Sequence, residues 1–175
     1  PGSRWSHEVV FDASIGQCVL FGGTTSSSRL SDTWTWDGSQ WVQQSPSQVP
    51  AARDTHGMLF DPSLNAVTMF SGYSGSQPGR NDTWTYSNQD WVQISTSVQP
   101  ASRHWVTQCF VYDQARGEAI LFGGWNGGTL SDTWTFDGTE WRPKLEYVTS
   151  PINGNRYALT PPMTWQDAED LAVLE

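Results

Sequence analysis

Three copies of one motif, spaced by 50 residues, constrain the fold of this chain more than any other feature of its sequence. The motif Asp-Thr-Trp-Thr followed by an aromatic residue begins at Asp32, Asp82 and Asp132. A second Trp follows each copy at one fixed distance, at Trp41, Trp91 and Trp141. Such a period is typical of folds built from repeated units, in which each unit buries its apolar faces against its neighbours.

Each copy predicts four short strands, here called A to D, because its apolar runs are short and are bounded by turn-forming residues. Strand A ends at Phe11, Phe60 or Tyr112, and strand B ends at Phe21, Phe70 or Phe122. Strand C holds the Asp-Thr-Trp motif, and strand D starts at the second Trp. The pairs Asp37-Gly38 and Asp137-Gly138 predict tight C-to-D hairpins, since Gly tolerates positive φ, and Asn88 takes that place in the second copy.

Composition agrees with an all-β chain and excludes some partners. Eleven Trp and sixteen Gly stand beside only nine Lys and Arg, as in a chain of short strands and turns. The net charge of −9 argues against nucleic acid, because affinity for phosphates needs clustered cations. No apolar run approaches the roughly 18 residues that a membrane-spanning helix requires, so we expect no membrane span.

The repeat resembles the kelch repeat, whose marks are a Gly doublet, an aromatic strand beginning near Asp-x-Trp, and a later Trp. The doublets Gly22-Gly23 and Gly123-Gly124 fit this pattern, whereas Ser71-Gly72 departs from it at the first position. The resemblance covers residues 4–148. It implies an all-β fold, a partial kelch-type β-propeller of three four-stranded blades over residues 1–148, with further blades outside this sequence.

The repeated Trp residues invite two interpretations. Tandem Trp rings can stack on sugars, but a fixed place in every copy favours packing within and between blades. We therefore assign a structural role to six of them: Trp34, Trp41, Trp84, Trp91, Trp134 and Trp141. The two cysteines, Cys18 and Cys109, lie in different strands of non-neighbouring copies, so we expect two buried free thiols.

The last part of the chain breaks the repeat. Residues 149–155 predict a linker rich in Pro and Asn, residues 156–160 a short strand, and Thr164 the N-cap of a helix. The order of strand and helix, with the spacing of Trp165 and Ala168, resembles the start of a C-type lectin-like domain over residues 156–175. That resemblance implies that the sugar- and calcium-binding part would follow Glu175. An ordinary amphipathic helix explains the same residues.

Candidate binding residues lie where the B-to-C and D-to-A connections emerge together at one end of the blades. These connections are longer and more variable than the A-to-B and C-to-D hairpins, and variable loops on a rigid scaffold are where binding usually resides. Rings beside Arg and amide groups suit sugars or acidic peptides. The candidate ligand-binding residues are Tyr73, Arg80, Arg103, Trp105, Trp125 and Asn126. Three of the candidates have no evident counterparts in the repeat: Tyr73, Arg80 and Trp125. The other Arg recurs in every copy, as Arg4, Arg53 and Arg103, so each of these Arg residues could instead tie a loop to the next blade.

These observations favour a non-catalytic recognition module that binds a glycan or a protein and needs no cofactor in its blades. We expect the protein to be secreted or to lie at the cell surface. The alternative is the scaffold of a copper-dependent carbohydrate oxidase similar to galactose oxidase, and a third hypothesis is a structural spacer. No two of the three histidines, His7, His56 and His104, have the short spacing of metal ligands, and no nucleophile motif is present, so we predict no catalytic or metal-binding residue.

Overall fold

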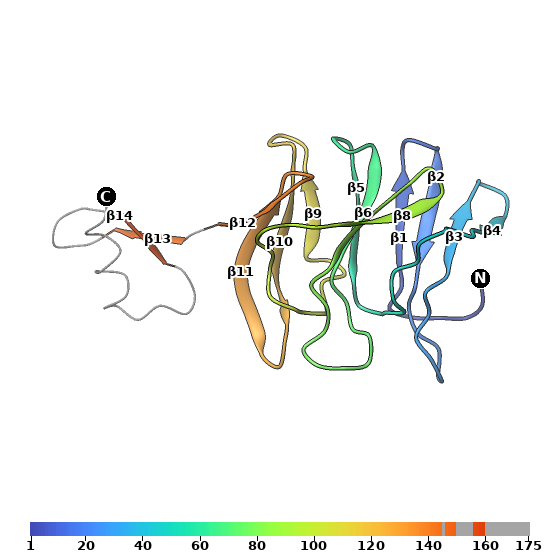
Figure 1. The fold of residues 1–175 in the computed structure, drawn as a ribbon, viewed down its shortest axis with the longest axis horizontal. Coiled ribbons are helices and arrows are strands. Elements are labelled where there is room, and N and C mark those ends of the chain that lie inside the picture. Colours follow the sequence, from blue (N-terminus) through green and yellow to red (C-terminus); the bar gives the residue numbers. More distant parts are fainter. Residues whose placement is uncertain (145, 150–155, 160–175) are drawn as a thin grey trace.

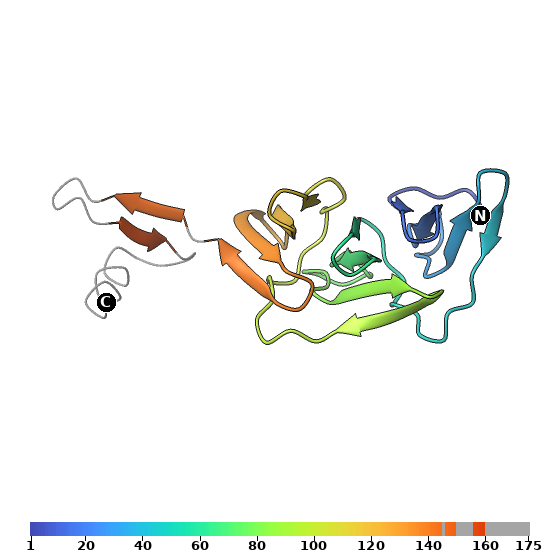
Figure 2. The ribbon, with the colours of Figure 1, turned by 90° about the horizontal axis from the view of Figure 1, so that it is seen from above.

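The computed structural model describes residues 1–144, 146–149 and 156–159 of the chain. Within these residues the protein is all-β and has no helix. Three antiparallel sheets of four strands each follow the order of the sequence, so every sheet is an up-and-down meander (Figure 1). Figure 2 shows from above that the three sheets stand side by side. This architecture confirms the predicted partial propeller of three four-stranded blades.

Each blade contains the four strands A to D that the repeat predicts. The first blade consists of β1 (Glu8–Asp12), β2 (Gln17–Phe21), β3 (Thr33–Trp36) and β4 (Trp41–Gln43). The second consists of β5 (Gly57–Asp61), β6 (Ala66–Phe70), β7 (Thr83–Ser87) and β8 (Asp90–Ile94). The third consists of β9 (Phe110–Asp113), β10 (Glu118–Trp125), β11 (Thr129–Phe136) and β12 (Trp141–Lys144).

The hairpins form as the turn residues predict. Gly38 and Gly138 have φ of 101° and 95°, a region that favours glycine. In the second blade Asn88 and Gln89 both have positive φ, 50° and 64°, so two adjacent residues make that turn. Each A-to-B turn is led by an Asp whose carboxylate accepts a hydrogen bond from the backbone N–H two residues later, as Asp12 does from Ser14 at 2.9 Å.

The third blade differs from the first two in the length of its middle strands. Strand B was expected to end at Phe122, but β10 continues to Trp125 past a β-bulge between Phe122 and Gly124. Beyond the bulge, Gly124 pairs with Leu130 and Trp125 pairs with Thr129. The B-to-C connection of this blade is therefore a short hairpin, because few residues separate the two strands.

Two apolar clusters fill the two junctions between blades. At the first junction Phe21 and Val19 of the first blade pack with Met69, Tyr86 and Trp91 of the second. At the second junction residues of the second and third blades form the other cluster, which includes Phe70, Phe110 and Trp141. Both thiols, Cys18 and Cys109, are free as predicted, although each is half-buried and not fully buried.

Beyond the third blade the structure describes one more hairpin. Strand β13 (Glu146–Thr149) pairs with β14 (Arg156–Leu159), and β14 coincides with the short strand expected there. The helix expected after Thr164 lies outside the described residues, as does most of the segment that resembles a lectin-like domain. The described residues contain no helix that could span a membrane.

Candidate binding face

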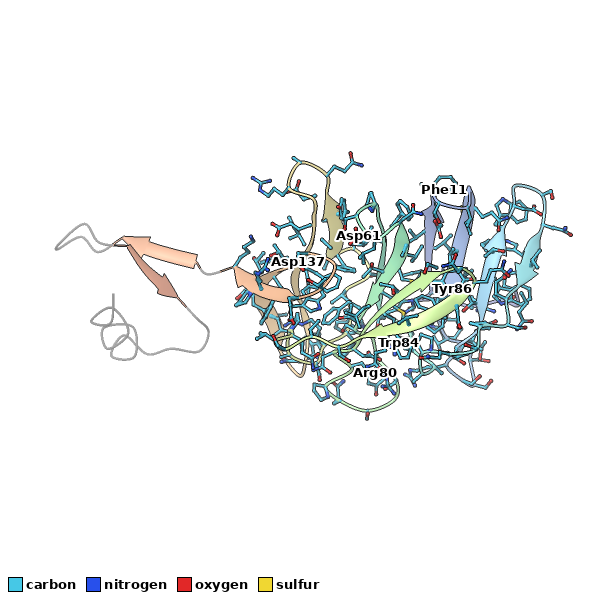
Figure 3. All side chains as sticks on the ribbon, turned by 45° about the horizontal axis from the view of Figure 1, so that its top comes forward. Phe11, Asp61, Arg80, Trp84, Tyr86 and Asp137 are labelled. Atoms are coloured by element: carbon cyan, nitrogen blue, oxygen red, sulfur yellow. The ribbon has the colours of Figure 1, made fainter. Side chains whose placement is uncertain are left out.

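The up-and-down order of the strands gives the blades two different ends. The B-to-C and D-to-A connections lie at one end, here called the loop face, and the A-to-B and C-to-D turns lie at the other, here called the hairpin face (Figure 1). In Figure 3 Arg80 lies at the loop face, and Asp61 lies toward the opposite end of the same blade.

A repeated triad of Arg, Asp and Trp holds the loop face in shape. In the second blade the guanidinium of Arg53 donates to both carboxylate oxygens of Asp82, at 2.7 Å each, and to the carbonyl of Ser71 at 2.8 Å. The indole of Trp84 donates to Asp82 Oδ2 at 2.8 Å. Bidentate pairs of this kind fix orientation as well as charge, so the triad joins the D-to-A segment to the start of strand C.

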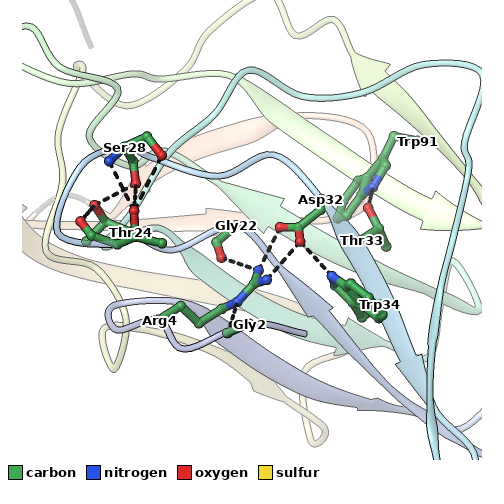
Figure 4. A network of polar contacts seen from close by, with 10 residues as sticks. Gly2, Arg4, Gly22, Thr24, Ser28, Asp32, Thr33, Trp34 and Trp91 are labelled. Atoms are coloured by element: carbon green, nitrogen blue, oxygen red, sulfur yellow. Dashed lines mark hydrogen bonds and ion pairs between the residues drawn. The ribbon is translucent and has the colours of Figure 1, made fainter.

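The same triad recurs in the other two blades. Figure 4 shows Arg4, Asp32 and Trp34 of the first blade, with Arg4 Nη1 at 2.6 Å and Trp34 Nε1 at 2.6 Å from the Asp32 oxygens. In the third blade Arg103 donates to Asp132 and to the carbonyl of Gly123. Three of the repeated Trp residues, Trp34, Trp84 and Trp134, thus lie half-buried with their indole N–H bound to an Asp.

The third triad and its neighbouring carbonyls fix the position of the Arg103 side chain. Its side chain has no exposed surface, and its donors already bind Asp132, Gly123 and Ala101. The backbone carbonyl of Arg103 also accepts a hydrogen bond from Gly72 N of the preceding blade at 3.3 Å. The geometry therefore matches the alternative in which the recurring Arg ties a loop to the next blade.

The Asp of each triad stays ionised because its hydrogen bonds outweigh its burial. Burial alone would raise the pKa of Asp82, but the hydrogen bonds and charge of Arg53, the Trp84 indole and the charge of Arg80 together lower it below the ordinary value. Asp32 and Asp132 show the same balance, with lowered pKa. The triad is therefore an ion pair at neutral pH in every blade.

The Gly doublet allows the loop face to pack closely. A Cβ added to Gly23 would lie 2.7 Å from the Cβ of His7, and one added to Gly72 would lie 2.8 Å from the Cβ of His56. Both distances are shorter than any real contact, so the second residue of the doublet must be Gly. Ser71 occupies the first position with φ of 70°, and its hydroxyl donates to the carbonyls of Arg80 and Arg103. Those bonds account for the departure from the doublet in the second blade. The two doublets proper, Gly22-Gly23 and Gly123-Gly124, all have positive φ.

The backbone of the loop face repeats even where its side chains do not. An isolated β-bridge joins Asp54 to Tyr73 in the second blade and His104 to Trp125 in the third, at the place of the Trp5 to Thr24 bridge in the first. Tyr73 and Trp125 thus occupy one repeat position with Thr24. Arg80 likewise has a counterpart in Leu30, since the two backbone N–H groups make equivalent bonds to Gly72 and Gly23. The positions repeat, but their side chains vary freely.

Four aromatic side chains of the loop face form a continuous row across the second and third blades: Tyr73, His104, Trp105 and Trp125. Ring centroids lie 5.0 Å apart between Tyr73 and His104, 5.2 Å between His104 and Trp105, and 5.6 Å between Trp105 and Trp125. We call these four residues the aromatic row. Arg29 of the first blade extends the row, because its guanidinium carbon lies 4.3 Å from the centre of the Tyr73 ring.

Trp105 is the most exposed member of the aromatic row, at 58% of its surface. Its φ is 57°, and the equivalent residues Ser6 and Thr55 have φ of 55° and 53°. The left-handed conformation therefore belongs to the repeat, and the first two blades fill it with small polar residues. The repeat therefore does not require a large ring here, and the exposed surface of Trp105 is available to a partner.

Charged groups flank the aromatic row. Arg29 Nε lies 2.8 Å from Asp54 Oδ2, so this guanidinium is already neutralised. Among the described residues, the carboxylate paired with Arg80 is that of Asp82, at 4.0 Å, and the Arg80 side chain is 37% exposed. Burial lowers the pKa of His104, Asp54 partly opposes this effect and Arg29 adds to it, so the ring is neutral near pH 7. Arg80 is thus the cation best placed to meet an acidic group.

The sequence-predicted residues are only partly brought together. Tyr73, Trp105 and Trp125 join the aromatic row, whereas Asn126 lies in the short turn of the third blade, where its N–H donates to Gly128 O at 3.1 Å. Sequence reasoning missed Asp54 as a partner of this face. Its position directly after the recurring Arg, matched by His104 in the third copy, was the available signal.

Within residues 1–144, 146–149 and 156–159, no three His, Cys, Asp or Glu side chains are placed to hold a metal ion. His56 is fully buried, and that burial lowers its pKa to about 3. Both of its ring nitrogens lack a hydrogen-bond partner in the described part of the chain. His56 therefore serves as a neutral packing residue whose ring meets Phe21 edge-on at 5.6 Å.

A comparison with protein families agrees with this architecture. A family model described as the KLHDC2/KLHL20/DRC7 Kelch-repeats domain matches residues 1–157. This range includes all three blades and strand β13, and it ends within strand β14. No curated protein matches the chain.

Proposed function

The chain belongs to the family of the KLHDC2/KLHL20/DRC7 Kelch-repeats domain, which suggests a protein-interaction module, and we propose that its loop face binds a segment of a partner protein. Domains of this family are typically non-catalytic. The match supports a protein partner and lends no support to glycan binding or to an oxidase scaffold. The finer proposal concerns where on the blades the partner sits and which side chains meet it.

The aromatic row is the observation that carries this proposal. Its rings lie 5.0 to 5.6 Å apart from one to the next, and it presents Trp105 to solvent on a backbone position that the repeat fixes. Trp, Tyr and Arg dominate the binding energy of protein interfaces. Trp and Tyr cover much area with few rotatable bonds. A rigid row of this kind loses little conformational entropy on binding.

The charges beside the row suggest which segment fits. The chain as a whole carries a net charge of −9, so a strongly acidic partner would be repelled at long range. Arg80 nevertheless offers a local cation beside the rings, and an Arg guanidinium binds carboxylates in a forked geometry. We therefore propose a partner segment with an apolar side chain for Trp105 and one acidic group for Arg80.

The test uses peptides selected from a random peptide display library against the 175-residue chain. Trp105→Ser places in the third blade the residue that the first blade has at this position, so folding should be unchanged. Affinity for the selected peptides should fall about tenfold or more, as is usual when a central aromatic residue of an interface is lost. Ile15→Ser is the matched control, since Ile15 is an exposed apolar residue of the hairpin face.

Thermal unfolding of each variant separates binding from stability. The proposal requires that Trp105→Ser keep the wild-type midpoint while it loses the peptide. If Ile15→Ser abolishes binding and Trp105→Ser does not, the partner sits on the hairpin face.

A further inference from the structure

The side chains of the aromatic row occupy positions that are open to solvent even where a blade lies on each side. The middle blade packs between the first and the third, and its Thr55 and Tyr73 are both only half-buried. Thr55 stands at the place of Trp105, and Tyr73 stands at the place of Trp125. Access to these positions is therefore a property of the loop face.

The backbone groups of the bridged residues are already paired with each other. Tyr73 and Asp54 exchange two backbone hydrogen bonds, at 2.8 and 3.0 Å, and Trp125 and His104 exchange two more, both at 2.9 Å. A partner that adds a β-strand to a sheet gains its affinity from main-chain hydrogen bonds. Such a partner would find these backbone groups occupied, so we do not expect strand addition along the row.

The side chains of the row carry hydrogen-bond donors that are still unused. Within the residues that the structure describes, the indole N–H groups of Trp105 and Trp125 and the hydroxyl of Tyr73 make no hydrogen bond. In the same part of the chain, Nε of the Arg80 guanidinium has no hydrogen-bond partner. Indole and guanidinium groups only donate hydrogen bonds, so the row is mainly a donor surface.

The carboxylate beside the row is already engaged. Asp54 Oδ2 lies 2.8 Å from Arg29 Nε, and Asp54 Oδ1 accepts a hydrogen bond from Thr55 Oγ1 at 3.1 Å. His104 is only 4% exposed, so its ring nitrogens are largely withdrawn from a partner. A bound main chain with many N–H groups would leave some of them without an acceptor, which costs free energy.

We propose that the segment bound by the loop face is proline-rich and lies along the aromatic row as a polyproline II helix. This inference rests on the proposed function of the loop face and names the class of its partner. Pro has no backbone N–H, and a polyproline II helix has no internal hydrogen bonds, so its carbonyls are free to accept. Rings that carry donors suit such a helix, because the ring covers the apolar Pro while the N–H or O–H binds a carbonyl.

The period of this helix predicts the sequence pattern of the partner. A polyproline II helix has about three residues per turn, so prolines at every third position lie on one side and face the row together. One acidic residue at an end of the proline run should meet Arg80, whose side chain is 37% exposed. The partner should therefore contain Pro at every third position beside an acidic residue.

The first test compares two synthetic peptides by titration calorimetry against the 175-residue chain. One is an oligoproline with a Glu at each end, and the other has Ala in place of every Pro. We expect the oligoproline to bind at least about tenfold more tightly, because each Ala adds an N–H without an acceptor and loosens the helix. Equal affinity for the two peptides, or no binding of the oligoproline, would overturn the inference.

Variants that remove a donor but keep a ring test the hydrogen bonds. Tyr73→Phe and Trp125→Phe should each weaken binding of the oligoproline about fivefold, which is the usual effect of one lost hydrogen bond. Tyr112→Phe is the matched control, because it removes a hydroxyl near Gly117 in a turn of the hairpin face, and it should leave the affinity unchanged. Unchanged affinity in both donor variants would overturn the proposed mode of binding.

The failure of this inference and the failure of the proposed function give different results. Peptides selected from the random display library that lack Pro at every third position, but lose affinity in Trp105→Ser, would keep the loop face as the binding surface and overturn the proline-rich partner. Peptides of either kind that lose affinity in Ile15→Ser and not in Trp105→Ser would overturn both.

Discussion

Trp91→Ala tests how much of the stability of this chain comes from packing between blades. Trp91 is fully buried, its indole meets Phe21 and Tyr86, each at 5.1 Å, and its N–H donates to Thr33. A Trp side chain buries roughly 200 Å², which at about 25 cal/mol per Å² corresponds to about 5 kcal/mol. Measured Trp→Ala changes in cores span about 3–5 kcal/mol. We therefore expect the free energy of unfolding to fall by about 3–5 kcal/mol.

Urea unfolding followed by circular dichroism measures this change. Trp41→Ala is the matched control, because Trp41 holds the same position in the first blade but is only half-buried. It should lower the free energy of unfolding by clearly less than Trp91→Ala does. Equal effects of the two substitutions, or an unchanged midpoint for Trp91→Ala, would refute the assignment of the junction as the source of stability.

Three further predictions concern the loop face and the first blade. Asp82→Asn should destabilise the chain by about 3–5 kcal/mol at neutral pH, since it leaves the buried Arg53 without its counter-charge. Because the pKa of Asp82 is lowered, the stability that this pair gives the wild type should be complete above the ordinary Asp pKa of 3.8 and lost as pH falls through the pKa of the folded state, as a urea series at several pH values would show. Burial raises the pKa of Glu8 to about 7 from 4.5, so the folded state disfavours its ionised form, and Glu8→Gln should raise the thermal midpoint at pH 8 but not at pH 4; a gain at pH 4 would contradict this cause. Gly72→Ala should lower the free energy of unfolding by about 1–3 kcal/mol more than Gly75→Ala, because both residues have positive φ but only Gly72 is crowded, and equal values in urea would contradict the crowding.

The blades were predictable from the sequence because each repeats a local pattern. The hairpin at Gly38 follows from one dipeptide, and the strands follow from short apolar runs between turn residues. The extension of strand B to Trp125 was not predictable in the same way. It depends on a bulge at the Gly doublet and on the short distance to Thr129, which together let the third blade close its B-to-C connection as a hairpin.

The binding face was predictable in position but not in detail. Topology alone placed Tyr73 and Trp125 at one end of the blades. Their contact through His104 and Trp105 depends on bridges between segments far apart in the sequence. The triads could not be separated from ligand-binding Arg residues by sequence, because a guanidinium that binds a partner and one that binds Asp132 share the same residue type.

Hydrogen–deuterium exchange with a bound peptide tests most directly whether the loop face is the binding surface. The probe is the tightest peptide selected from the random display library, added in excess to the 175-residue chain. Our assignment predicts slower exchange in the loop-face segments, residues 73–81, 103–107 and 125–130, and unchanged exchange in the hairpin-face turns at residues 12–17, 61–66 and 113–118. Protection confined to the hairpin-face turns, with the loop-face segments unchanged, would contradict it.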